Sequence, residues 1–181
     1  LRDQLGYADS RNEVEYMLDN NYINVKNRNV SDVTSPVGLF DVIEFSKTEE
    51  YFRIFPQANG RLAATKITKI AAETKLGKVI RKTPVPGGNI QLTLHDGENI
   101  EKRPGVGYNR KDSVVIDESN NIIAHFAFVE GARAVITDGS HTGIIGEIES
   151  IEIVKSSSPN QVIVNAEDGK KYKTIEDNIV V

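Results

Sequence analysis

The end of the chain alternates short apolar segments with turns, and this alternation constrains the fold more than any other feature. The segments ARAVIT, GIIGEI, SIEIV, QVIVNA and TIEDNIVV follow one another at short, regular spacing. Asp168-Gly169 and the run SSSPN are clear turn signals between them. Short strands at such spacing are typical of a small β-barrel. We therefore expect the last part of the chain to form one.

The first part of the chain predicts two helices followed by short strands. Ser10 can cap a helix over SRNEVEYMLDN, and Glu13, three residues later, completes a capping box. Val14, Met17 and Leu18 form one apolar stripe on that helix. The segments YINV and DVIEF then read as strands. This pattern indicates a small α+β module.

The middle of the chain mixes both kinds of signal. Asn59-Gly60 is a strong hairpin signal. The segment TKITKIAAETKL predicts a short helix with Ile67, Ile70 and Ala71 on one side. IQLTL is a strand that HDG turns back, and SVVID and IIAHFAF read as paired strands. The fold class expected is α+β, predominantly β, with three domains over residues 1–46, 47–128 and 129–181.

Composition excludes several classes of protein. The chain has no cysteine, so disulfides and thiolate zinc sites are excluded. No apolar run approaches the roughly 20 residues that a membrane-spanning helix needs. The sequence starts at Leu1 and shows no signal peptide, so we expect a further segment before it.

The net charge of −4 conceals a strongly uneven distribution. Residues 1–58 carry −4, residues 59–111 carry +7 and residues 112–181 carry −7. A solvated face is the usual meaning of a charge run. Here the excess has one sign and spans several elements, so we favour contact with a polyanion. The candidate phosphate contacts are Arg61, Lys66, Lys69, Lys75, Lys78, Arg81, Lys82, Lys102, Arg103, Arg110 and Lys111.

A glycine-bounded loop, DGSHTG, lies inside the predicted barrel. Gly139 and Gly143 permit tight turns and a close approach of the backbone to a ligand. Ser140, His141 and Thr142 offer hydrogen bonds at the tip. A simple hairpin turn explains the same residues equally well.

The residues do not assemble a catalytic or metal site. His95, His125 and His141 have no metal-ligand spacing between them. We interpret His125 as a sheet residue and His95 as part of a hairpin turn. The sequence contains no nucleophile elbow, Walker loop or dinucleotide fingerprint. We therefore expect no enzyme activity, no cofactor, no metal and no small-molecule substrate.

Two stretches resemble known RNA-binding motifs. Residues 131–148, GARAVITDGSHTGIIGEI, resemble a KOW motif of ribosomal proteins and NusG-type transcription factors. The run LRDQLGYADSRNEVEYMLDNNYINVKNRNV, with PVGLFDVIEF, resembles the S-four-type RNA-binding domain. In this order, with GGNIQLTLHDGENI between them, they are similar to the small-subunit ribosomal protein S-four-e family of archaea and eukaryotes.

That resemblance implies a three-part fold bound to small-subunit ribosomal RNA, a cytoplasmic ribosome-associated location and neighbouring ribosomal proteins as further partners. It also implies a basic extension before Leu1, and neither catalysis nor a cofactor. Arg11, Lys26 and Arg28 are the RNA-contact candidates in the first module, although its second helix is otherwise acidic. Gly139, Ser140, His141 and Thr142 are candidates in the KOW loop, which has no Lys or Arg.

Two alternatives differ in class from a ribosomal RNA-binding protein. The −7 charge of the last segment favours a KOW-type module that meets a protein partner in transcription or translation. An RNA-modifying enzyme with an S-four-type domain, such as a pseudouridine synthase, would need a catalytic domain. The segments assigned above leave no room for one.

Overall fold

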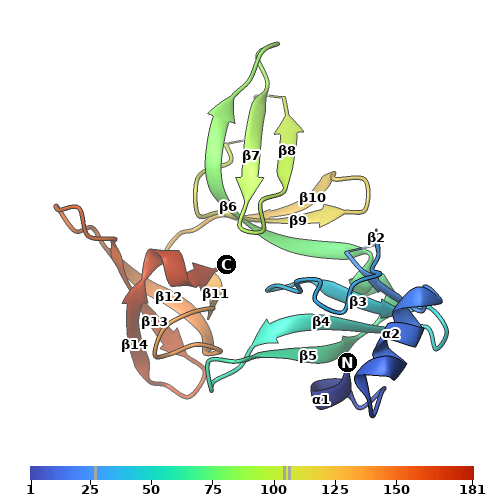
Figure 1. Cartoon of the computed structure of the whole chain (residues 1–181). Coiled ribbons are helices and arrows are strands. Elements are labelled where there is room, and N and C mark those ends of the chain that lie inside the picture. Colours follow the sequence, from blue (N-terminus) through green and yellow to red (C-terminus); the bar gives the residue numbers. More distant parts are fainter. Residues whose placement is uncertain (27, 104, 106) are drawn as a thin grey trace. The chain divides into compact units, whose positions relative to one another are not determined.

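Three five-stranded sheets dominate the structure (Figure 1). The computed structural model describes residues 1–26, 28–103, 105 and 107–181. The chain forms two compact units, one of Leu1–Phe55 with Leu62–Lys75 and one of Pro56–Arg61 with Leu76–Val181. The expected α+β, predominantly β fold is confirmed. The division into three domains stays a prediction.

The first unit begins with two helices and contains the first sheet, ordered β2-β1-β3-β4-β5. Gly6, with φ 67°, ends α1 in the left-handed conformation. The Ser10 hydroxyl accepts a hydrogen bond from the Glu13 amide at 3.3 Å, which confirms the predicted cap. The Glu13 carboxylate accepts from the amide of Asp9. The elements are α1 (Arg2–Leu5), α2 (Arg11–Asp19), β1 (Ile23–Val25), β2 (Arg28–Asn29), β3 (Val42–Phe45), β4 (Glu50–Pro56) and β5 (Leu62–Ile67).

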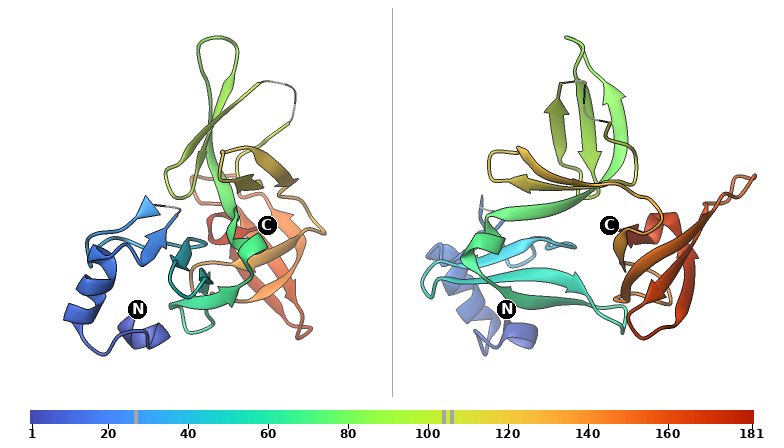
Figure 2. Two further views of the ribbon diagram at one scale, coloured as in Figure 1. Left: turned by 90° about the vertical axis from the view of Figure 1, so that its right-hand side faces the viewer. Right: turned by 180° about the vertical axis from the view of Figure 1, so that it is seen from behind.

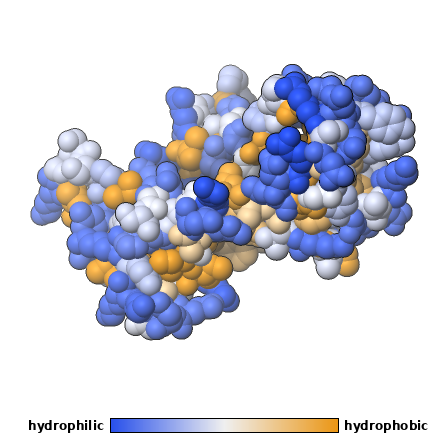
Figure 3. Space-filling view, turned by 60° about the horizontal axis from the view of Figure 1, so that its bottom comes forward, coloured by the Kyte–Doolittle hydropathy of each residue, from blue (hydrophilic) through white to orange (hydrophobic). Residues whose placement is uncertain are grey.

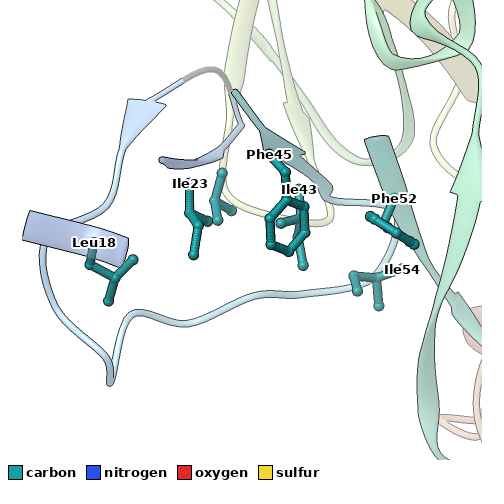
Figure 4. Close-up of a cluster of buried hydrophobic side chains, with 7 residues drawn as sticks. Leu18, Ile23, Ile43, Phe45, Phe52 and Ile54 are labelled. Atoms are coloured by element: carbon teal, nitrogen blue, oxygen red, sulfur yellow. The ribbon is translucent and has the colours of Figure 1, made fainter. Parts of the chain in front are cut away.

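One apolar cluster holds this unit together. The two helices lie against the sheet (Figures 1 and 2), and the predicted stripe of α2 faces it through Val14, Met17 and Leu18. Burial of such side chains is the main stabilising contribution to a small module. The buried members of the cluster are Leu18, Ile23, Val25, Ile43, Phe45, Phe52 and Ile54 (Figure 4).

The helix predicted over TKITKIAAETKL is wrong in most of its length. Only α3 (Lys69–Ala72) is helical, between β5 and β6 (Thr74–Pro84). Thr68 caps α3, and Arg53 donates hydrogen bonds to the carbonyls of Ala71 and Thr74 where the helix ends. The β-branched residues on both sides of α3 fit strands better than a helix. Pairing in the sheet therefore overrides the helical spacing.

The second sheet belongs to the second unit and has the order β10-β9-β6-β7-β8. The predicted pairing of SVVID with IIAHF is confirmed, with a register shift between Ile122 and Ala124. Its buried cluster contains Val79, Leu92, Leu94, Ile100, Tyr108, Val114 and Ile116. Its strands after β6 are β7 (Ile90–Leu94), β8 (Asn99–Lys102), β9 (Ser113–Asp117) and β10 (Ile122–Phe126).

The third sheet, ordered β14-β13-β12-β11-β15, brings the last strand back to the first, as a small barrel requires. GIIGEI and SIEIV were predicted as two strands, but they form one strand with a register shift between Ile148 and Ser150. TIEDNIVV is interrupted by a 3₁₀ turn, η1 (Glu176–Asn178). The strands are β11 (Arg133–Ile136), β12 (Ile145–Glu152), β13 (Gln161–Ala166), β14 (Lys171–Ile175) and β15 (Ile179–Val180).

None of the helices in the described ranges is long and apolar enough to cross a bilayer. On the face drawn in Figure 3, hydrophobic residues are interspersed with hydrophilic ones.

Candidate nucleic-acid interface

Four of the cations predicted to contact RNA already have carboxylate partners. Arg11 pairs with Glu15 at 2.9 Å on exposed α2, and Lys26 Nζ lies 3.1 Å from the buried carboxylate of Asp41. These two pairs, and that of Lys66 with Glu50, lie in the first unit. Their positive charge is at least partly compensated within the protein. The fourth cation, in the second unit, is Lys111, which pairs with Glu176 and Asp177.

Lys78 is buried and serves the interior of the second unit. Its side chain comes from β6, and its ammonium group donates to the carbonyls of Glu176 at 3.0 Å and Asp177 at 2.7 Å. The pKa of Lys78 falls to about 8, mainly because the ammonium is removed from water; nearby Lys111 also lowers this pKa, and the carboxylates of Asp177 and Glu176 oppose the shift. This ammonium is directed at the 3₁₀ turn of the third sheet rather than at solvent. We therefore leave Lys78 out of the proposed interface.

Lys82 and Arg110 are held in place by carbonyl groups and not by carboxylates. Lys82 Nζ donates to the Tyr108 carbonyl at 2.8 Å, and Arg110 Nε donates to the Ile80 carbonyl at 3.1 Å. The loop before β9 thus runs along β6. Lys82 of β6 bonds to the backbone of the loop, and Arg110 of the loop bonds to the backbone of β6. A carbonyl restricts the side chain without cancelling its charge. Both cations remain at the surface with an uncompensated charge in a fixed position.

A further set of cations has no partner of either kind. Among the described residues, their side chains make no hydrogen bond or close ion pair, and all are exposed except Lys102, which is half-buried and lies within electrostatic reach of the Asp117 carboxylate. Such side chains can contact a phosphate without first breaking an internal pair. Lys75, in contrast, is half-buried at the start of β6 and has a partner. The set is Arg28 and Lys69 in the first unit and Arg61, Arg81, Lys102 and Arg103 in the second.

The glycine-bounded loop is packed against the protein over half of its length. The Thr142 hydroxyl is buried and donates to the Gly139 carbonyl at 2.7 Å, and the His141 ring lies 5.0 Å from that of Tyr172. Gly143 has φ 85°, and a Cβ there would lie 2.5 Å from the backbone carbon of Gln57. Both conditions require glycine. Only Gly139 and Ser140 of the four predicted contacts are exposed.

The histidines have structural surroundings. His125 lies in β10, as predicted, with Nε2 2.7 Å from the buried carboxylate of Asp112. That carboxylate also accepts from the amides of Asn109 and Phe128, so it fixes the loops around β9. Within residues 1–26, 28–103, 105 and 107–181, no group of three or more His, Asp or Glu side chains could hold a metal ion.

Sequence reasoning passed over one surface cluster with RNA-binding chemistry. Tyr16 on α2 is 61% exposed, and its ring meets the edge of Tyr22 at a centroid distance of 6.3 Å. Lys47 Nζ lies 4.9 Å from the centroid of the Tyr22 ring. The sequence could have indicated this cluster, because Tyr16 lies outside the apolar stripe of α2 and an aromatic residue there faces solvent.

Comparisons with known proteins agree with the sequence resemblance. Residues 48–123 match the family described as Ribosomal family S4e. The small ribosomal subunit protein eS4 of Haloarcula marismortui is 43% identical over all of this chain and 78% of that protein, and its Archaeoglobus fulgidus counterpart is 38% identical over 100% and 75%. The crystal structure of the 30S ribosomal protein S4e from Thermoplasma acidophilum superposes with a TM-score of 0.82, at 30% identity, over 99% of this chain and 89% of that one. The chain therefore belongs to ribosomal protein family S4e.

Proposed function

We propose that this chain is a non-enzymatic constituent of the small ribosomal subunit in the cytoplasm and that it binds ribosomal RNA. The observation that carries this proposal is the set of surface cations without a carboxylate partner. In the second unit these are Arg61, Arg81, Lys82, Arg103 and Arg110. The eS4 names of the relatives support the same role.

The cations would act on the phosphate backbone. Each phosphate that a lysine or arginine neutralises releases condensed counterions, and this release supplies much of the binding free energy. Arginine can also donate two parallel hydrogen bonds to one phosphate. Lys82 and Arg110 lose less side-chain entropy on binding, because carbonyl groups already hold them. These contacts position the protein on folded RNA without reading its sequence.

The acidic C-terminal sheet supports a second role for that part of the chain, contact with neighbouring ribosomal proteins. Residues 127–181, which contain this sheet, hold five Lys/Arg against nine Asp/Glu, and this net charge of −4 disfavours a phosphate backbone. Four of the five cations there face a carboxylate: Arg133, Lys170, Lys171 and Lys173. If so, reversing exposed acidic residues of this sheet should impair assembly into the subunit more than binding to naked RNA.

Binding of the chain to small-subunit ribosomal RNA over a salt series tests the proposal. We expect the logarithm of the affinity to fall linearly with the logarithm of the salt concentration, at about 0.7 to 0.9 per phosphate contact. The variant Arg81→Gln/Arg103→Gln should bind at least tenfold more weakly and reduce the slope by about two contacts.

The matched control is Lys155→Gln/Lys170→Gln, which removes the same charge from exposed positions of the C-terminal sheet. It should leave both the affinity and the slope close to those of the wild type. Absence of salt-dependent binding by the wild-type chain would refute the RNA-binding role. Equal losses in both double variants would mean that only net charge matters and that the central cations form no interface.

A further inference from the structure

The most exposed aromatic side chain of the described residues is Tyr16 on α2. It is 61% exposed, while the next, Phe126 on β10, is 46% exposed. The buried stripe of α2 lies on the other side of the helix, so the Tyr16 ring contributes nothing to the core of the first unit. The exposed ring therefore presents a flat aromatic face that a ligand can cover.

Neighbouring residues restrict this ring on one side. Tyr22 is half-buried and packs on the core, and it meets Tyr16 edge to face at an interplanar angle of 76°. The Tyr22 amide donates to the Met17 carbonyl at 2.9 Å, and its carbonyl accepts from the Ser46 amide at 2.9 Å. The backbone of Tyr22 is therefore fixed to both α2 and the sheet. Edge-to-face contact with a fixed ring limits the orientations of Tyr16.

The surrounding charges select the kind of ligand. Glu13, Glu15 and Asp19 lie on the same helix, so a phosphate backbone cannot run along α2 without repulsion. The flat face of an unpaired base carries no net charge, and aromatic side chains stack on any of the four bases. Lys47, above the Tyr22 ring, supplies one positive charge for the phosphate of that nucleotide.

We propose that Tyr16, supported by Tyr22 and Lys47, stacks on a single unpaired nucleobase of ribosomal RNA. This inference rests on the proposed function and adds a base contact to its phosphate contacts. Asn21, which is exposed and precedes Tyr22 in the chain, can donate to and accept from the edge of a base. The ligand is a bulged or looped-out nucleotide, because a base inside a duplex does not expose its face.

The test is binding of the full chain to small-subunit ribosomal RNA with substitutions at Tyr16. Tyr16→Ala should weaken binding at least about fivefold, since each stacked base contributes on this scale. The salt slope should fall by no more than about one contact, that of Lys47, because stacking itself releases no counterions. Tyr16→Phe keeps the ring and should bind like the wild type. Phe126→Ala, which removes the other exposed aromatic ring, is the matched control and should have no effect.

Base-specific chemical modification of the RNA gives a second readout. One nucleotide should be protected by the wild type and by Tyr16→Phe, and should be reactive with Tyr16→Ala. Wild-type affinity of Tyr16→Ala, with normal salt dependence of the wild type, would overturn the stacking site and leave the proposed function intact. A salt slope reduced by about two contacts or more in Tyr16→Ala would also overturn it. Failure of the wild type to bind RNA at any salt concentration would remove both proposals.

Discussion

The second and third sheets share an architecture but use their cations in opposite ways. In the C-terminal sheet Lys171 pairs with Glu149, and Lys173 pairs with Glu152 at 2.8 Å. In the central sheet the exposed side chains of Arg81 and Arg103 have no partner among the described residues. Exposed ion pairs contribute little to stability, but they occupy their cations. The comparison shows that the number of cations in a sheet does not identify a binding surface. The cations available to a ligand are those without a carboxylate partner in the protein.

A loop of the C-terminal sheet is closely packed where a loop of the central sheet is open. Glycine substitutions in these two loops should give the largest difference in stability between the sheets. Gly143→Ala should lower the free energy of unfolding by about 3 kcal/mol, because strain at φ 85° adds to a clash with the backbone of Gln57. Gly97→Ala in the central sheet has a similar φ of 87° but open space, so about 1 kcal/mol is expected. Urea unfolding of both variants measures the difference. Equal losses would contradict the close packing of the C-terminal loop.

Lys78 is an exception among the cations of the central sheet, because its ammonium group is buried and bonded to carbonyl groups of the protein. Its pKa is about 8 in the folded protein, against 10.5 ordinarily. Between these values the unfolded chain binds more protons, so the free energy of unfolding rises with pH across this window. The wild type should gain about 2 kcal/mol relative to Lys78→Met between about pH 7 and about pH 10.

Denaturant unfolding at several pH values measures this gain. Lys78→Arg is the control, because a guanidinium stays protonated throughout the window and should show no comparable rise. If the difference in the free energy of unfolding between the wild type and Lys78→Met did not vary with pH, the Lys78 ammonium would have to be well solvated.

An ion pair introduced into the central sheet should remove the difference between the two sheets. Thr93 on β7 lies opposite Arg81 on β6, so the two side chains share one face. Thr93→Glu should therefore give Arg81 a partner of the kind that Lys173 has. We expect about tenfold weaker binding to ribosomal RNA and a salt slope reduced by about one contact. Thr93→Gln, which has the same length but no charge, should bind like the wild type.

The converse change should have the smallest effect. Glu149→Gln/Glu152→Gln would release Lys171 and Lys173 from their partners. Stability should fall by less than about 1 kcal/mol, as for other exposed pairs. RNA affinity at low salt should rise about twofold to threefold through two newly uncompensated cations. Adding Lys171→Gln/Lys173→Gln in the same protein should cancel the rise, and a gain that survives would contradict this account.

Local signals predicted much of the fold. The Ser10 cap, the α2 stripe, the Asn59-Gly60 hairpin and most strands depend on neighbours in sequence, and the structure has them all. The failed helix over residues 65–76 shows the limit. Its apolar spacing suits a helix, but pairing with strands formed by distant residues decides the outcome. Likewise, only the pairing with β13 shows that residues 145–152 are one strand.

The candidate interface was less predictable for the same reason. Lys78 and Arg81 look alike in sequence, yet one is buried against residues 98 and 99 positions away and the other is exposed. The pairing of Lys111 with the 3₁₀ turn is equally remote. The Tyr16 cluster joins α2, the residue before β1 and the segment after β3, which no local pattern connects.

The contact between Lys78 and the 3₁₀ turn also has a consequence for the order of folding. A ribosome synthesises Lys78 long before Glu176, because 98 positions separate them. Until the turn emerges, the Lys78 ammonium has no carbonyl partners and favours water over the interior. Contacts this remote in sequence also form slowly, since a long loop must close first. We expect the central sheet to reach its final packing only after residues 176–180 are synthesised, so that the two sheets of the second unit complete their folding late and together.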